Sequence, residues 1–394
     1  MKHLLKSLPA RILVAIAAGI ALGLAAPAWL AGAAATFNSL MGQLLRFLIP
    51  LIIIGFVAPA IADVGRRAGR LLVATALLAY AATFLAGLMS YGISAATFPM
   101  IIDPSLASTA AEAEVRSVRP WFEVDVPGLM GVTTSLALAF LLGLGCAAAD
   151  APALRRGLSE FRTIVAMAID RAVVPLLPPY IMCIFLIMAV EGRVAPVLAT
   201  FAGIIGVIFA MHILILLVQY AVAGAIAGKN PLRMLRTMLP AYLTALGTQS
   251  SAATIPVTLR QTVRMGVSED VAGFTVPLCA TIHMSGSTLK IVACAMALMM
   301  MHGQACPPVM FMHFIAMLGI TIIAAPGVPG GAIMASLGLL ASILDFDADM
   351  QAMMIALYIA MDSFGTACNV TGDGAIAAII DRFFGKRRCD TPKM

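Results

Sequence analysis

Residues 358–380 read YIAMDSFGTACNVTGDGAIAAII, a stretch apolar enough and long enough to cross a bilayer that nevertheless contains two aspartates. On a helix that turns by about 100° per residue, four polar side chains fall within about 60° of one another: Asp362, Thr366, Asn369 and Asp373. A carboxylate at bilayer depth costs at least about 2.5 kcal/mol, so this polar stripe must face protein, water or a cation. The polar stripe predicts a path or site for an ion and a small polar solute, with simple helix-to-helix contacts as the alternative.

The whole chain has the composition of a membrane protein with many spans. Of its 394 residues, 61% are hydrophobic and only 11% are charged. No soluble fold could bury so much apolar surface, and long apolar runs recur along the sequence. The seven cysteines form no CxxC pair and are interpreted as packing residues. The net charge of +6 is explained by its placement between apolar runs, so no nucleic-acid partner is expected.

Apolar runs and flanking charges predict the topology. Membrane segments are expected near 10–33, 38–62, 71–98, 128–149, 163–190 and 195–228, followed by a broken region and the striped helix. When the segments alternate across the membrane, most Lys and Arg residues fall on one side, and the opposite connections carry only Arg116, Arg119 and Arg193. This bias predicts a bacterial-type cytoplasmic (inner) membrane protein with both termini in the cytoplasm.

Two interruptions predict re-entrant hairpins. The charge bias requires the region of about 231–265 to enter and leave on the cytoplasmic side, with its tip at TQSSAATIP, residues 248–256. A second break, APGVPGGA at residues 325–332, would enter and leave from outside within a hairpin of about 306–345. Unwound backbone at membrane depth survives only where protein or a watery cavity satisfies it.

Each hairpin precedes a full crossing, at about 270–301 and about 350–384, so the same unit occurs twice in opposite orientation. Inverted repeats with broken helices that meet near the membrane midplane are typical of secondary transporters. An ion channel is the alternative from another class. An enzyme is not expected, because Ser250 and Ser251 lie in no nucleophile motif.

The first of these crossings contains a third interruption, TIHMSGSTLK at residues 281–290. Gly286 lies between two serines and is the expected point of unwinding, where carbonyl oxygens could bind Na⁺. The alternative for His283 is a neutral histidine that only hydrogen-bonds between helices.

Lys290 belongs to the same interrupted stretch. If the helix were continuous, it would share a face with His283 and Ser287. A lysine buried in the membrane must lose its proton or pair with a carboxylate, and Asp362 and Asp373 are the expected partners.

These motifs resemble the dicarboxylate/amino acid:cation symporter family, which includes glutamate and neutral amino acid transporters. TQSSAATIPVTLRQTVRMGVSEDVAGFTVPLCATIHMSGST, residues 248–288, is similar to the family's serine-rich first hairpin and interrupted seventh helix. GVPGGA, residues 327–332, resembles the tip of the second hairpin, and DSFGTACNVTGD, residues 362–373, resembles the eighth helix. The resemblance implies an all-α polytopic membrane protein with eight transmembrane helices plus two re-entrant helical hairpins, assembled as a homotrimer with an elevator-type movement.

The resemblance also implies a division of the chain. Scaffold and trimerisation helices are expected in residues 1–66 and 127–194. A third helix and external loop would occupy residues 67–126, and residues 195–385 would form the transport domain.

Substrate contacts carry over residue by residue. The resemblance implies that Asp362 holds the substrate's amino group, that Asn369 binds its main carboxylate and that Thr366 lines the pocket. The other residues placed around the substrate are Ser250, Ser251, Ser287, Val328, Gly330 and Gly365.

The coupling ion is expected to be Na⁺ or H⁺, and no other cofactor is implied. The resemblance places one Na⁺ site at Asp373 together with the backbone carbonyls of Cys279, His283 and Asn369. The carbonyl of Thr281 and the sulfur of Met284 would contribute to another. Amides at half-helix ends suit an anion, whereas carboxylate and carbonyl oxygens suit a hard cation.

The sequence departs from the family pattern at the substrate. Where acidic-substrate members carry an arginine, this chain has Gly365, and the aspartate that would support that arginine is replaced by Tyr358. The bidentate clamp for a side-chain carboxylate is therefore missing, which favours import of a small neutral amino acid. Lys290 could supply a substitute charge, so a dicarboxylate or an acidic amino acid is the alternative substrate.

The seventh-helix motif is altered as well, because His283 and Ser285 stand where the family has asparagine and aspartate. Loss of a carboxylate removes both a cation ligand and its compensating charge. Lys290 or a protonated His283 is the candidate replacement for a lost cation.

Overall fold

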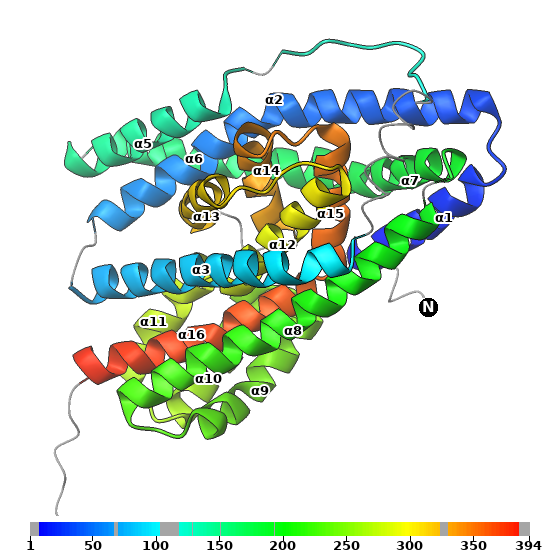
Figure 1. Cartoon of the computed structure of the whole chain (residues 1–394). Helices are drawn as coiled ribbons and strands as arrows, with labels where there is room; N and C mark the ends of the chain where they lie inside the picture. The colour runs from blue at the N-terminus through cyan, green and yellow to red at the C-terminus, as the bar shows by residue number, and fades with distance from the viewer. Residues whose placement is uncertain are drawn as a thin grey trace, which may run out of the picture.

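The computed structural model describes residues 8–66, 70–102, 118–127, 129–149, 151–192, 194–323 and 330–385, and in these ranges it is helical without strands (Figure 1). The all-α class is confirmed. The elements in chain order are α1 (Leu8–Gly23), α2 (Ala28–Arg66), α3 (Arg70–Thr97), the 3₁₀ turn η2 (Phe98–Met100), α5 (Val132–Ala148), α6 (Pro152–Ala168), the π-helical η3 (Ile169–Val173), α7 (Val174–Val190), α8 (Val194–Ala227), α9 (Pro231–Thr248), α10 (Ser251–Arg264), α11 (Glu269–Ile282), α12 (Ser285–Met301), α13 (Pro308–Ile323), α14 (Gly331–Ile343), α15 (Ala348–Ala360) and α16 (Asp362–Phe384).

Several helical stretches have the length and apolar composition of membrane spans. In the described part of the chain these are Ala28–Pro59, Arg70–Met100, Pro152–Val190, Val197–Ala227 and Glu269–Met301, and the bent pair α15–α16 adds a sixth. α1 and α5 are apolar but shorter. A topology of eight transmembrane helices and two hairpins requires that α1 and α5 also cross the membrane. This topology stays a prediction.

The first predicted segment boundary is wrong. α1 ends at Gly23 rather than near residue 33, and α2 begins at Ala28. Proline has no amide hydrogen with which to extend a helix. Pro27 instead caps α2, because its carbonyl accepts hydrogen bonds from the amides of Leu30 and Ala31, at 3.0 and 3.3 Å.

The segment predicted at 163–190 begins earlier than expected. The amphipathic helix α6 starts at Pro152 and continues through the π-helical residues Ile169–Val173 into α7. α6 contains Arg155, Arg156 and Arg162, and these charges lower the mean hydropathy of its sequence. A search for apolar runs therefore does not detect the start of this helix.

The helices form two packed groups with a central layer between them. α1 packs on α7, and α2 packs on α5, α6 and α7, while α8, α9, α10, α11 and α16 pack on one another. In Figure 1 the first group runs along the upper part of the molecule and the second along the lower part, with α12, α13, α14 and α15 between them. α12 to α15 share the largest apolar core with the first group, and α12 also contacts α8 and α16.

α3 supports the interrupted segment α11–α12. Ser90 donates a hydrogen bond to the Leu289 carbonyl (2.7 Å), and the Met284 amide donates to Thr83 Oγ1 (3.3 Å). In Figure 1 α3 passes beside α12. The residues around the break in this segment are therefore held from the α3 side.

Both predicted hairpins form pairs of helices in contact. α9 and α10 meet at Gln249 and Ser250, where Gln249 has a left-handed backbone, within the predicted first tip. α13 and α14 make the second pair. Their connection, residues 324–329, lies outside the described residues, and so does the predicted substrate contact Val328.

Gly286 is not the point of unwinding, and that prediction is wrong. The segment breaks at His283 and Met284, and Gly286 lies in the first turn of α12. A Cβ atom at position 286 would lie 2.7 Å from both Cys368 Cβ and the Gly365 carbonyl oxygen. The missing side chain therefore lets α12 approach α16 closely.

The predicted crossing of about 350–384 is not one straight helix. α15 and α16 meet at Met361 and are bent by 62°. No proline or glycine lies at the bend, so the usual sequence signals of a kink are missing. The bend makes Asp362 the first residue of α16. The Tyr358 carbonyl, in the last turn of α15, accepts the Met361 amide (3.2 Å).

Candidate functional site

The polar stripe lies on α16 and is buried along its whole length. The exposed fractions are 3% for Asp362, 8% for Thr366, 5% for Asn369 and 1% for Asp373. A buried carboxylate needs a charge partner or several hydrogen bonds. Each aspartate is therefore best described by the groups that it contacts.

Asp362 pairs with a fully buried lysine. Lys290 Nζ lies 2.9 Å from Asp362 Oδ1, and the Gly330 amide donates to Asp362 Oδ2 at 2.7 Å. The predicted pairing of Lys290 with a carboxylate is confirmed, and Asp362 is that carboxylate. Removal of one partner from such a buried pair typically destabilises a protein by about 3–5 kcal/mol.

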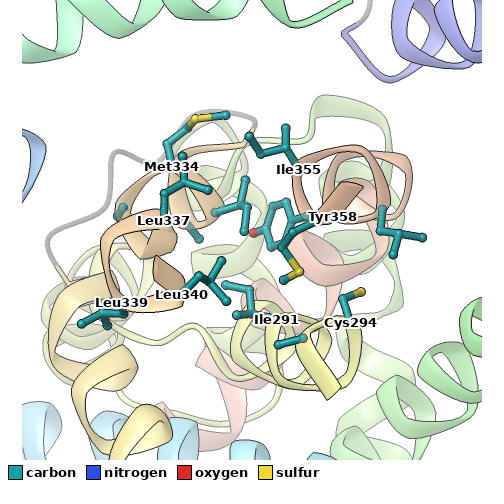
Figure 2. Packing of buried hydrophobic residues seen from close by; sticks show 14 of the residues in the cluster. Ile291, Cys294, Met334, Leu337, Leu339, Leu340, Ile355 and Tyr358 are labelled. Atoms are coloured by element: carbon teal, nitrogen blue, oxygen red, sulfur yellow. The ribbon is translucent and has the colours of Figure 1, made fainter. Parts of the chain in front are cut away.

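Tyr358 forms the other side of the lysine site. Its carbonyl accepts a hydrogen bond from Lys290 Nζ (3.3 Å), and its ring centroid lies 3.4 Å from the same nitrogen. A desolvated ammonium over an aromatic face is attracted by about 2 kcal/mol. Figure 2 shows Tyr358 within an apolar cluster from α12, α14 and α15 whose other labelled members are Ile291, Cys294, Met334, Leu337, Leu339, Leu340 and Ile355.

Gly365 leaves the space that Lys290 fills. A Cβ atom at position 365 would lie 2.9 Å from Lys290 Nζ, 3.0 Å from Cε and 3.5 Å from Cδ. The end of the lysine therefore runs where a side chain of residue 365 would begin. The ammonium group of Lys290 thus reaches the surface of α16 from α12.

Asn369 binds the N-terminus of α12. Its Oδ1 accepts hydrogen bonds from the amides of Gly286 (2.8 Å) and Ser287 (3.3 Å), and its Nδ2 donates to Ser287 Oγ (3.0 Å). The first amides of a helix lack intrahelical acceptors and carry partial positive charge. Tyr358 also donates to Ser287 Oγ (3.1 Å), so these groups form one connected network.

Asp373 contacts the imidazole of His283. Nδ1 lies 2.9 Å from Asp373 Oδ1, and both side chains are 1% exposed or less. In neutral histidine one ring nitrogen donates and the other accepts. His283 Nε2 lies 3.4 Å from Gln219 Nε2, which also donates to Ser285 Oγ (3.1 Å).

The groups around Asp373 have the chemistry that a hard cation requires. Asp373 supplies a carboxylate that contacts His283, the residue at which α11 ends. The last carbonyls of a helix have no partner in the following turn, and here Cys279 O accepts the His283 amide (2.8 Å). Oxygen ligands of this kind suit Na⁺ rather than a transition metal. Across the described ranges no cluster of three His, Cys, Asp or Glu side chains could hold a metal ion.

A family model described as "Sodium:dicarboxylate symporter family" matches residues 8–383. The chain belongs to this family. Membership confirms the resemblance drawn from the hairpin and α16 motifs, and it makes the protein a helical membrane transporter of small molecules. It also implies Na⁺ as the coupling ion, and it does not distinguish a neutral amino acid from a dicarboxylate as the substrate.

Two predicted residues of this symporter lie at the first hairpin break. Ser250 caps α10, because its Oγ accepts a hydrogen bond from the Ala253 amide (3.3 Å), and Ser251 is the first residue of that helix. α10 packs against α16, the helix that carries the polar stripe. Contact of either serine with substrate stays a prediction.

The two residues of the second predicted Na⁺ site flank the break in α11–α12. Thr281 lies in the last turn of α11, and its hydroxyl donates to the Leu278 carbonyl (2.7 Å). Met284 is buried at the break, and its carbonyl accepts the Thr288 amide (2.9 Å). Whether they bind an ion stays a prediction.

Sequence reasoning missed the polar residues of α8. His212 Nε2 lies 3.1 Å from the Gly286 carbonyl oxygen, Gln219 contacts His283, and Tyr220 donates to the Thr371 carbonyl (2.7 Å). The available signal was the seven-residue spacing of His212 and Gln219, which puts both on one face of an apolar helix.

Proposed function

We propose that this symporter couples Na⁺ to the import of a small solute that carries a carboxylate group, by alternating access. The supporting observation is that α16 places Asn369 and Asp373 one turn apart beside the break between α11 and α12. Donors for an anion and ligands for a cation therefore lie next to each other. Adjacent binding sites for opposite charges allow one ligand to favour the other, which is the thermodynamic basis of coupling.

The anion would bind at the N-terminus of α12. The amides of Gly286 and Ser287 point toward α16, and Asn369 adds a side-chain amide to the same place. A carboxylate is stabilised at a helix N-terminus by the backbone amides and by the helix dipole. In the conformation described here Asn369 occupies these donors, so substrate would share them with Asn369 or replace it.

The cation would bind at Asp373 and the carbonyls of Cys279, His283 and Asn369. In this conformation His283 Nδ1 contacts one carboxylate oxygen of Asp373. To bind an ion at Asp373, the imidazole would have to move away, or the ion and the imidazole would each contact the carboxylate. Na⁺ entering beside a carboxylate compensates the negative charge that the substrate brings.

Two substrate classes satisfy the carboxylate requirement. Gly365 favours a small neutral amino acid, because no arginine is present to clamp a second carboxylate. The buried Lys290 favours a carboxylate without an amino group, for the reasons developed below.

The division into moving parts belongs to the same proposal. Residues 195–385 would form a transport domain that moves in elevator fashion against the scaffold helices of residues 1–66 and 127–194, within a homotrimer in the inner membrane. In support, α8, α9, α10, α11 and α16 pack on one another and lie almost wholly within residues 195–385, although α12 to α15 share an apolar core with the scaffold helices. α3 hydrogen-bonds to α12, so we assign it to the transport side.

Uptake into proteoliposomes tests the function. The purified protein should import labelled solutes from a panel of amino acids and dicarboxylates under an inward Na⁺ gradient, with saturation and counterflow that a channel would not show. A pH gradient alone should not drive uptake. Failure of every carboxylate in the panel to show Na⁺-dependent uptake would contradict the proposal.

A further inference from the structure

The carboxylate of Asp362 is fully engaged inside the protein. One oxygen contacts the ammonium of Lys290 at 2.9 Å, and the other accepts the amide of Gly330 at 2.7 Å. The family resemblance assigns Asp362 to the amino group of the substrate. The ammonium group of a lysine is chemically the same partner as a protonated α-amine.

Lys290 is built into this position. It is fully buried, the end of its side chain passes over Gly365, and its nitrogen contacts both the carbonyl and the ring of Tyr358. Gly365 is required for this arrangement, because a Cβ atom there would lie 2.9 Å from the nitrogen. The lysine is thus held by several groups besides Asp362.

An amino acid would have to compete with this lysine. To reach Asp362, its ammonium group must displace Lys290 and leave a buried cation without a carboxylate, which is strongly unfavourable. Displacement would also disturb the contact between Asp362 and Gly330.

A carboxylate without an amino group meets no such obstacle. Its oxygens can use the amides of α12 and the side chain of Asn369, and the pair between Lys290 and Asp362 stays intact. The negative charge that it brings is compensated by the coupled Na⁺.

We propose that Lys290 is a tethered replacement for the substrate's amino group, so that this transporter selects carboxylates without an α-ammonium group over the corresponding amino acids. This inference rests on the function proposed above. It gives Lys290 the role of a specificity-determining residue and predicts that selectivity depends on the charge pair between α12 and α16.

Matched substrate pairs test the inference in the wild-type protein. Succinate and aspartate differ by one α-ammonium group, as do propionate and alanine. Uptake of each is measured in proteoliposomes under the same Na⁺ gradient, and the ratio of kcat/KM within each pair is the readout. The member without the amino group should be favoured by about 100-fold in at least one pair, as expected when a buried pair must be broken to admit the other.

Variants then test whether Lys290 causes the preference. Lys290→Met should lower the ratio at least about tenfold, because Asp362 is released to bind an ammonium group. The double variant Lys290→Met/Asp362→Asn should restore the preference, because no carboxylate remains to attract the amine. Lys229→Met is the matched control. The side chain of that lysine donates to the carbonyls of Met265 (3.2 Å) and Gly266 (2.8 Å), so the ratio should not change.

Each outcome has a defined meaning. If aspartate and alanine show the same kcat/KM as succinate and propionate, the inference is overturned and the proposed function stands. An unchanged ratio of kcat/KM in Lys290→Met has the same meaning. Absence of Na⁺-dependent uptake for all four solutes would overturn both. If Lys290→Met does not fold, the charge-neutral double variant and the shift in Tm of the wild-type protein with each solute still decide. A larger stabilisation by aspartate than by succinate, and by alanine than by propionate, contradicts the inference.

Discussion

At the scale of single residues, the side chains at positions 290 and 365 depend on each other. Lys290 needs Gly365 for space, and it needs Asp362 for charge. Because its interior location forbids an unpaired ammonium, the three residues act as one unit, and a change at any of them alters the other two.

Gly365→Ala should therefore destabilise the protein although alanine favours helices. The new Cβ would lie 2.9 Å from Lys290 Nζ and 3.0 Å from Cε, so the lysine must shift away from Asp362. We expect a loss of about 1–3 kcal/mol, typical of overpacking in a filled interior, seen as a lower Tm of the purified protein.

Gly273→Ala is the matched control for this prediction. Gly273 also lies inside a helix, α11, and a Cβ atom there meets no atom within 4 Å. This variant should be neutral or more stable by about 0.5–1 kcal/mol. Equal effects of the two substitutions would show that the space over Gly365 is not filled as described.

Asp373 permits a second prediction at this scale. Asp373→Asn removes the carboxylate expected to bind Na⁺, so the rise in Tm with NaCl over choline chloride at equal ionic strength should shrink strongly. Asp381→Asn provides the control. Asp381 lies on the same helix, but its Oδ1 accepts hydrogen bonds from the amide (3.1 Å) and the hydroxyl (2.5 Å) of Ser268. An undiminished Na⁺ effect in Asp373→Asn would remove Asp373 from the cation site.

At the scale of elements, the site is built where helices stop. α11 ends at Ile282, α12 begins at Ser285, and α16 begins at the bend after α15. Each end exposes amides or carbonyls that a continuous helix would use internally. Asn369 accepts the first amides of α12, and Asp362 accepts the Gly330 amide at the start of α14. These contacts explain how interrupted backbone is tolerated in the protein interior.

Asn369→Ala should separate capping from transport. The substitution removes the acceptor at the N-terminus of α12, which we expect to cost about 1 kcal/mol of stability and to reduce carboxylate uptake strongly. Asn230→Ala makes the same kind of change at α9, where Asn230 Oδ1 accepts the Arg233 amide (3.0 Å). The control should lose similar stability and keep uptake, so a comparable loss of uptake in both variants would count against a substrate role for Asn369.

At the scale of the whole molecule, the proposed elevator movement requires α15 to slide past α2 and α7. In the conformation described here, Tyr180 of α7 donates to the Ala348 carbonyl (3.0 Å), and a Cβ atom at Gly42 of α2 would lie 2.9 Å from Ala348 Cβ. Both contacts join the proposed scaffold to the start of α15.

A disulfide across this contact should arrest transport. In Gly42→Cys/Ala348→Cys, a separation of the helices by about 1 Å brings the Cβ atoms to the spacing of a disulfide. Oxidation should abolish uptake and reduction should restore it, whereas neither single variant should respond. Full uptake by the cross-linked protein would show that these helices do not move relative to each other.

Much of this organisation could be predicted from the sequence because it depends on local pattern. Apolar runs identified a membrane protein, and the charge bias and two interruptions of the apolar pattern predicted both hairpins. Helical periodicity placed four polar residues on one face of α16. The bend at Met361 could not be predicted, because no proline or glycine marks it. The role of Gly286 was mistaken, because its contact with α16 is not visible in the neighbouring sequence.

The sequence by itself determined that a buried lysine needs a carboxylate and that α16 carries two of them. Only the tertiary structure decided that Lys290 pairs with Asp362, 72 residues away, while Asp373 contacts His283. The physical reason is that burial and helical period are properties of neighbouring residues in the chain. The choice of partner depends on how separate helices pack, and here on the space left by one glycine.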